Sequence, residues 1–261
     1  MRALLSIHDL MPETRAAVSS MLAHLFAALP ALQPRHITLL VVPGRAWCSA
    51  DIDWLQGLAE AGHPLAGHGW QHQAVATAQR SLSHHLHSAL LSRDAAEHLS
   101  RPAHQVLADV LRCHAWFVDH DLPVSPLYVP PAWAAGAVSA GHWAASPFAL
   151  LETLSGIHDT RRGEQHWLPL LGYQADNRTR VNLLRSSNRF NKWLATWSGR
   201  PLRIGLHPDD LDYGLAGQLL ADLHQVTEFV DYRQYVADHA RKPLPGKQSV
   251  AVSAAPQLRA R

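Results

Sequence analysis

Apolar runs and amphipathic stretches alternate along the first part of the chain. Short runs rich in Leu, Ile, Val and Ala predict buried strands at residues 2–7, 36–42 and 64–67. Between them, the spacing of apolar residues predicts helices at about 15–29 and 51–61, with Asp51 as the N-cap of the second. Strands that alternate with helices predict a parallel sheet with crossover helices, so we expect an α/β fold.

The same periodicities continue to about residue 224. They predict helices at 101–120, 177–197 and 215–224, and strands at 122–129, 148–157, 167–173 and 202–206. Residues 73–100 are rich in Ala, Ser, Gln and His and predict a lid or a loop that leads into a helix. A metal cluster at His84, His85 and His87 is the alternative there. Residues 242–261 lack periodicity and predict a disordered tail.

Composition favours one large domain, residues 1–241. The chain has 261 residues, of which 47% are hydrophobic and 17% charged, enough to bury a large core. The formal net charge of +2 and the scattered basic residues give no reason to expect a nucleic-acid partner. Cys48 and Cys113 lie far apart and outside any C-x-x-C spacing, which favours two free thiols.

The start of the chain bears on location. Residues 1–7 lead directly into His8 and leave no room for a secretory signal peptide. No apolar run reaches the roughly 18 residues that a membrane span needs. We therefore expect a cytoplasmic protein with no membrane span, and the sequence does not indicate its oligomeric state.

Polar side chains follow three of the predicted strands. They are His8 with Asp9, His68 with His72, and His207 with Asp209. Because functional groups in parallel α/β folds gather at the carboxyl ends of the strands, these side chains are expected to converge. One carboxylate and two imidazoles with open positions form a typical hydrolytic metal site, in which the metal activates water and polarises a carbonyl.

The histidine pair at 68 and 72 and the arginines of the helix expected at 177–197 each allow a second interpretation. His68 and His72 can share a cation if a helical turn begins there, because residues i and i+4 lie on one face. With 19 histidines in the chain, the same spacing could arise by chance. The arginines at 178–189 could bind phosphate or form a solvated helix face.

Four motifs, in chain order, carry a family resemblance. Ser6-Ile7-His8-Asp9, His68-Gly69-Trp70-Gln71-His72, Val129-Pro130-Pro131-Ala132-Trp133 and Gly205-Leu206-His207-Pro208 resemble the motifs of the polysaccharide deacetylase superfamily (NodB-type, carbohydrate esterase family four), and most closely one bacterial branch of it. The first two motifs are fairly specific in combination, and the later two are weaker. The resemblance covers roughly residues 3–235.

The resemblance implies a NodB-like distorted (β/α) barrel with fewer than eight parallel strands. It also implies a divalent metal, with zinc the expected ion, and removal of an acyl group, N-acetyl above all, from a sugar or sugar-containing glycolipid. Carried over to this chain, the metal ligands are Asp9, His68 and His72, and His207 is the general acid. Pro131 and Trp133 wall the substrate groove, and Trp133, Tyr128 and Trp70 are candidates for stacking on a sugar ring.

Two positions depart from the family pattern. His8 stands where the family usually has an aspartate as general base, and Val129 stands where it usually has an arginine. His8 could serve as the base because an imidazole near a metal stays neutral, or it could orient Asp9. Another carboxylate, or the metal-bound water alone, could replace it. Asp209 or Asp210 could keep His207 protonated.

The alternative functions follow from the same observations. A deformylase or amidohydrolase acting on a non-polymer substrate keeps the metal and changes the substrate. A non-catalytic carbohydrate-binding protein is the alternative from another class, because the usual aspartate and arginine are missing. The sequence does not identify the acyl group, the sugar, the native metal or the pathway.

Overall fold

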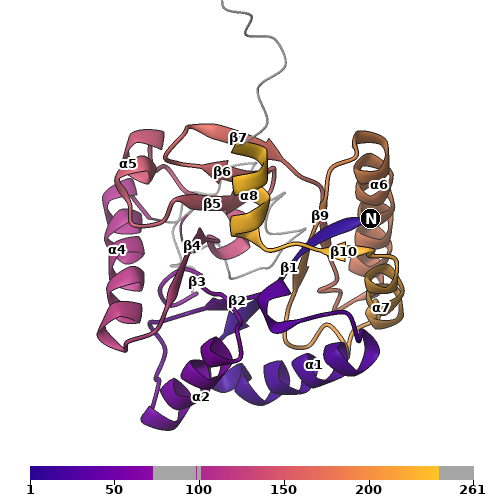
Figure 1. The fold of residues 1–261 in the computed structure, drawn as a ribbon, viewed down its shortest axis with the longest axis horizontal. Coiled ribbons are helices and arrows are strands. Elements are labelled where there is room, and N and C mark those ends of the chain that lie inside the picture. Colours follow the sequence, from indigo (N-terminus) through magenta and orange to yellow (C-terminus); the bar gives the residue numbers. More distant parts are fainter. Residues whose placement is uncertain (73–97, 99–100, 241–261) are drawn as a thin grey trace, which may run out of the picture.

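The computed structural model describes residues 1–72, 98 and 101–240 (Figure 1). The histidine cluster at 84–87 and the predicted tail at 242–261 lie outside these residues. The described strands are β1 (Arg2–Leu10), β2 (Ile37–Val41), β3 (Leu65–Gly67), β4 (Val124–Tyr128), β5 (Leu150–Thr153), β6 (Gly156–Asp159), β7 (Glu164–Trp167), β8 (Leu170–Gly172), β9 (Leu202–Leu206) and β10 (Glu228–Phe229). The described helices are α1 (Arg15–Ala28), α2 (Ser49–Glu60), α4 (Ala103–Asp119), α5 (Ala140–Ala145), α6 (Arg178–Ser198), α7 (Ala216–His224) and α8 (Tyr232–Ala240).

All of these strands belong to one sheet, in the order β7-β6-β5-β4-β3-β2-β1-β9-β8. The strands from β8 to β5 along this order are parallel neighbours, and β6 and β7 extend the edge as antiparallel strands. The short β10 lies parallel to the start of β1. The sheet curls into a half-barrel with α1, α2, α4, α6 and α7 around its outside (Figure 1). The expected α/β fold with a parallel sheet is therefore confirmed.

Alternate residues of the parallel strands face two separate cores. Leu5 and Leu39 point outward and belong to the larger core, which also holds Leu25 of α1 and Phe117 of α4. The neighbouring residues on the same strands point inward and form a second core with the C-terminal helix α8; they include Leu4, Leu40, Ala66, Leu127, Tyr235 and Val236. This alternation explains why the strands read as continuous apolar runs, since both faces of the sheet are covered.

Three sequence-based assignments need correction. The single strand expected at 148–157 is two antiparallel strands, β5 and β6, because the chain turns at residues 154–155 and Gly156 takes φ 145°. The strand expected at 167–173 is shortened to β8 (Leu170–Gly172), and Trp167 is instead the last residue of β7. Asp51 is the third residue of α2 instead of its N-cap: Cys48 is the N-cap, and its backbone N–H donates to Asp51 Oδ2 at 3.2 Å.

A buried ion pair joins strands that are not neighbours in the sheet. Arg203 of β9 and Glu152 of β5 are 0% and 1% exposed, and Nη1 lies 3.1 Å from Oε1. The guanidinium also donates to the backbone oxygens of Thr153, Leu154 and Leu168, at 2.5, 2.6 and 3.0 Å. Arg203 therefore ties β9 to the β5–β6 turn across the inside of the half-barrel. No helix in the described part of the chain is long and apolar enough to cross a membrane.

Candidate metal centre

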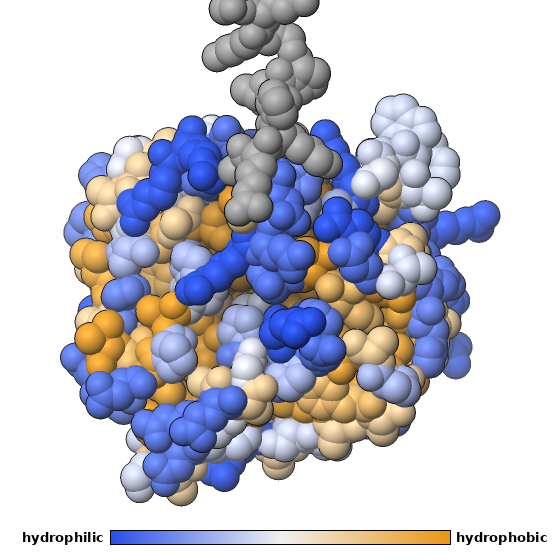
Figure 2. Space-filling view, in the orientation of Figure 1, coloured by the Kyte–Doolittle hydropathy of each residue, from blue (hydrophilic) through white to orange (hydrophobic). Residues whose placement is uncertain are grey.

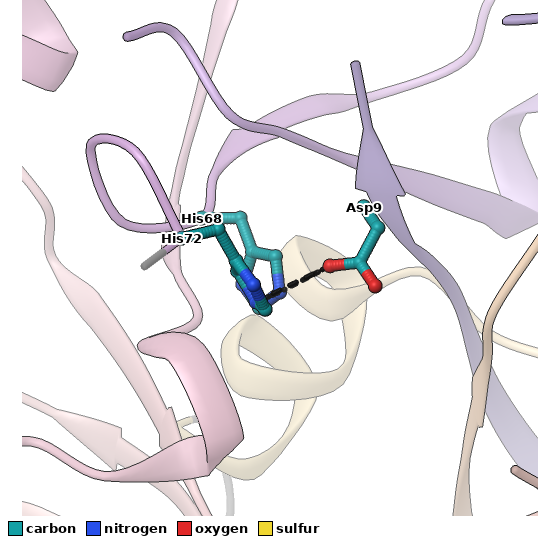
Figure 3. A group of neighbouring side chains, drawn as sticks. All are labelled: Asp9, His68 and His72. Carbon is teal, nitrogen blue, oxygen red and sulfur yellow. Dashed lines mark hydrogen bonds and ion pairs between the residues drawn. The ribbon is translucent and has the colours of Figure 1, made fainter. Parts of the chain in front are cut away.

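Asp9, His68 and His72 converge at the carboxyl ends of β1 and β3 (Figure 3). Asp9 is the penultimate residue of β1, and His68 directly follows β3. Asp9 Oδ1 lies 3.5 Å from His68 Nε2 and 3.2 Å from His72 Nε2, and the two Nε2 atoms are 3.2 Å apart. The three potential ligand atoms thus form a nearly equilateral triangle.

The hydrogen bonding of His68 fixes which ring nitrogen faces this triangle. Its Nδ1 lies 2.7 Å from the backbone oxygen of Val129, which can only accept, so Nδ1 carries the proton and Nε2 offers a lone pair. This is the usual outer contact of a metal-ligating histidine. Asp9 Oδ1 is buried without a hydrogen-bond partner among the described residues, so a cation bound at the triangle would satisfy it.

The size of the triangle fits some metal geometries better than others. In a tetrahedral zinc site with bonds of about 2.0–2.1 Å, two ligand atoms stand about 3.3 Å apart. Adjacent ligands of an octahedral magnesium stand about 2.9 Å apart at bonds of similar length. The observed separations of 3.2, 3.2 and 3.5 Å match the tetrahedral case. Imidazole nitrogens also favour zinc over magnesium, so these residues fit the expected ion.

The two histidines do not lie on a helical turn. Residues 68–72 form an irregular loop in which Gly69 has φ 73° and His72 has φ 57°. Asp9 also has a positive φ, of 56°. Residues other than glycine rarely adopt a positive φ, so the surrounding structure must hold the backbone of Asp9 and His72 in this conformation. Such conformations are common where side chains are positioned for function.

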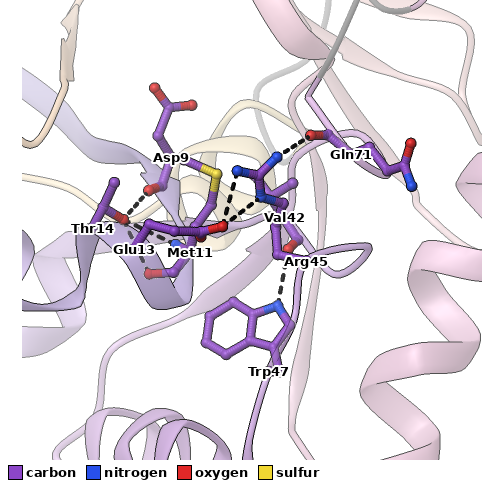
Figure 4. Close-up of polar contacts among 8 residues, drawn as sticks. All are labelled: Asp9, Met11, Glu13, Thr14, Val42, Arg45, Trp47 and Gln71. Atoms are coloured by element: carbon purple, nitrogen blue, oxygen red, sulfur yellow. Dashed lines mark hydrogen bonds and ion pairs between the residues drawn. The ribbon is translucent and has the colours of Figure 1, made fainter.

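A set of polar contacts behind the triangle holds the loops that follow β1, β2 and β3 (Figure 4). The Thr14 hydroxyl donates to the backbone oxygen of Asp9 at 2.5 Å. Arg45 donates to Glu13 at 3.0 Å and to the backbone oxygen of Gln71 at 3.3 Å. The arginine therefore links the segment after Asp9 to the loop that carries His72.

Three further residues pack around the triangle. The His8 ring is 2% exposed, and its centroid lies 4.8 Å from that of His68, 4.9 Å from that of His207 and 4.7 Å from that of Trp133. Ser6 Oγ lies 3.4 Å from His8 Nε2. The strand ends of β1, β3, β4 and β9 thus bring together the residues of all four sequence motifs.

Burial and neighbouring charges shift the pKa values of the site residues in ways that set their protonation states. Burial lowers the pKa of His72 to about 4, and burial together with the neighbouring His68 lowers the pKa of His8 well below its usual value. Burial alone would raise the pKa of Asp9, but His72 and His68 hold it well below its usual value. At neutral pH the side chains of His8 and His72 are therefore uncharged and Asp9 is ionised.

His207 differs from the other histidines. Burial alone would lower its pKa, but the adjacent Asp210 carboxylate raises it above the ordinary value. Asp210 is completely buried, and its Oδ2 lies 3.7 Å from His207 Nδ1 and accepts the backbone N–H of His207 at 2.8 Å. Of the two carboxylates considered from the sequence, Asp210 contacts His207, whereas the side chain of Asp209 is exposed.

The predicted substrate-binding residues do not all reach the site. Trp133 and Pro131 lie in the turn after β4, and the Trp133 indole donates to Glu152 Oε1 at 2.8 Å while packing on His8. Tyr128 is 0% exposed and packs against Phe148 in the core, so it offers no surface to a sugar. Trp70 is held between the Arg112 guanidinium, 4.2 Å from the ring centre, and Gly44.

The structure adds a cavity that sequence reasoning missed. An open cavity of about 520 Å³ lies between α6 and the segment from β7 to β8, and Trp133 lines it. Its other lining residues include Trp167, Leu170, Leu184, Leu194 and Trp197. These lining residues belong to separate helices and strands, so no local sequence motif indicated the cavity.

Comparisons of the chain with protein-family models, with curated proteins and with solved structures gave no match.

Proposed function

We propose that this protein is a metal-dependent hydrolase that removes an acyl group, N-acetyl above all, from a sugar or a sugar-containing glycolipid. The observation that carries the proposal is the convergence of the ligand atoms of Asp9, His68 and His72 within 3.5 Å of one another, beside the buried His8 and the partly buried His207. The curled α/β sheet is consistent with the NodB-like barrel that the sequence motifs imply. The motif resemblance supplies the substrate class.

The roles of the residues follow from their surroundings. A bound zinc ion would supply a Lewis acid for the acyl carbonyl and would acidify a water molecule. Asp9, His68 and His72 would hold it through the three atoms of the triangle. His8, buried and neutral beside them, is the group placed to accept a proton.

His207 is placed to act as the general acid. Asp210 occupies the side of its Nδ1, which leaves Nε2 for the leaving amine or alkoxide. The raised pKa of His207 favours the protonated form that a general acid needs, while the pKa of His8 is lowered. Two facing histidines with pKa values moved apart are typical of an acid and base pair.

The first test is metal content, measured by elemental analysis of the protein purified without added metal. Near-stoichiometric zinc is expected in the wild type, and loss of it in the double variant His68→Ala with His72→Ala. The matched control is His24→Ala with His224→Ala, which removes two exposed imidazoles from α1 and α7. Equal metal content in the two double variants would refute the site.

The second test separates the substrate classes. Release of acetate from acylated sugars, compared with hydrolysis of simple amides and formamides, distinguishes the proposed deacetylase from a deformylase or amidohydrolase. His207→Ala should lose turnover and keep its metal. Sugar binding without release of acetate, with or without bound metal, would instead support a non-catalytic carbohydrate-binding protein.

A further inference from the structure

The outer face of α6 exposes large apolar side chains that proteins in water ordinarily bury. Leu183, Phe190, Trp193 and Trp197 are 42%, 58%, 58% and 74% exposed. Their spacing of seven, three and four residues places them on one face of the helix. The rings of Phe190 and Trp193 are 5.7 Å apart, and those of Trp193 and Trp197 are 6.2 Å apart with planes at 12°. We call these four residues the aromatic stripe; as a contiguous patch, the stripe indicates an interaction site.

A basic row runs beside the stripe. Every charged residue of α6 is basic. Lys192 pairs with Asp222 and Arg180 with Asp176, whereas Arg178, Arg185 and Arg189 are exposed and have no ion-pair partner among the described residues. These three arginines, the basic row, recur at intervals of seven and four, so they share a face next to the stripe.

On its other side the stripe continues into the 520 Å³ cavity. Trp197 belongs to the stripe and also lines the cavity, and Trp167 of β7, 58% exposed, lines it from the facing side. Trp133, which is 5% exposed and packs on His8, also lines the cavity. In Figure 2, pale side chains project from the surface at the upper right, where Figure 1 places α6.

We propose that the aromatic stripe and the basic row dock this protein on the surface of a lipid bilayer with anionic headgroups. Trp and Phe with one apolar face and a basic flank are the composition of helices that lie in a membrane interface. Unpaired arginines are attracted to anionic headgroups, each contributing roughly fivefold in affinity. The mouth of the cavity then faces the lipid.

Charge argues for a bilayer over a second copy of the chain. A two-fold contact through α6 uses the same patch on both sides, so it brings one basic row close to the other. Like charges across an interface disfavour association, whereas anionic headgroups neutralise the row. Docking does not require the proposed hydrolase activity, because neither stripe nor row includes a metal ligand or His207.

The test is co-sedimentation of the full-length protein with vesicles. Vesicles of phosphatidylcholine with about a third phosphatidylglycerol should bind the wild type, with binding that weakens as salt rises. Pure phosphatidylcholine vesicles should bind it at least tenfold more weakly. Trp193→Ser with Trp197→Ser should weaken binding to anionic vesicles by at least tenfold, and Arg185→Gln with Arg189→Gln by about thirtyfold.

The matched control is Leu111→Ser with Val118→Ser on α4, where the side chains are 49% and 58% exposed. This variant should bind like the wild type. Equal melting temperatures across the variants show that each is folded. No binding to anionic vesicles, equal binding by the stripe variant and the control, or a dimer in solution that the stripe substitutions dissociate would each overturn the proposal. Metal content measured on the same samples distinguishes this outcome from failure of the hydrolase proposal.

Discussion

Removing the charge of Glu152 should destabilise the protein strongly. Glu152→Gln keeps the size of the side chain and an oxygen that can accept the Trp133 indole N–H, but it leaves Arg203 as a fully buried cation without its counter-ion. Breaking a buried ion pair by removing one partner costs about 3–5 kcal/mol. Arg203 keeps its hydrogen bonds to three backbone oxygens, so we expect a value near the lower end, about 3 kcal/mol.

The comparison that tests this reasoning is a surface ion pair with the same separation between nitrogen and oxygen. Arg2 Nε and Glu228 Oε2 are also 3.1 Å apart, but the side chains are 36% and 55% exposed. Glu228→Gln should therefore cost at most about 1 kcal/mol, because exposed pairs contribute little. The two substitutions differ mainly in burial.

The assay is equilibrium unfolding in urea, with the melting temperature as a second reading. A loss of about 3 kcal/mol should lower the melting temperature of a domain of this size by roughly 6–12 °C. Metal content should not change, since Glu152 does not contact Asp9, His68 or His72 in the triangle. A loss below about 1 kcal/mol for Glu152→Gln, equal to that of Glu228→Gln, would refute the view that this pair is held in a low-dielectric interior.

Two further predictions concern the site. Asp210→Asn removes the charge that raises the pKa of His207, so His207 should lose its proton at a lower pH. The alkaline limb of the kcat/KM profile should therefore move toward lower pH. An unchanged profile would exclude the pairing of Asp210 with His207 as the source of the acid. In Gly205→Ala the new Cβ would stand 3.1 Å from His8 Nε2, so turnover should fall and stability should drop by about 1–3 kcal/mol. Gly217→Ala in α7, where a Cβ meets nothing within 4 Å, should leave both unchanged or raise stability slightly.

Much of the α/β layout could be predicted because it depends on local periodicity. The runs that became β1, β2, β3 and β9 are mostly apolar, since both faces of these strands are covered. The edge strands β6 and β7 were harder, because β7 has only half-buried and exposed residues and lacks an apolar run. The helix α8 was missed although Tyr232, Tyr235 and Val236 repeat at helical spacing.

The candidate site likewise has features that the sequence shows and features that depend on the folded chain. The residue types at the strand ends could be found from the sequence, because the ends of parallel strands meet at one edge. The choice of Asp210 over Asp209 depends on the turn after β9, which buries one carboxylate and exposes the other. Likewise, nothing local shows that Tyr128 faces the outer core, whereas the inward face of β4 carries Leu127.

The backbone conformation at the metal triangle leads to a final prediction. His72 has φ 57°, a region that costs a residue with a Cβ about 1–2 kcal/mol and costs glycine almost nothing. His72→Gly and His72→Ala both remove the imidazole, so their difference isolates the backbone. The glycine variant should be more stable by about 1 kcal/mol in urea unfolding, even though glycine gains more entropy in the unfolded chain.

At His24, inside α1, the same pair of substitutions should show the opposite order, because alanine favours a regular helix by about 1 kcal/mol. An alanine variant at 72 that is as stable as the glycine variant would mean that the loop relaxes out of the left-handed region. The strained backbone at Asp9 and His72 would then not be needed to place Asp9 Oδ1 and His72 Nε2 at their separation of 3.2 Å. If the predicted order holds, the fold itself maintains the strained loop, and the triangle is organised before any cation binds.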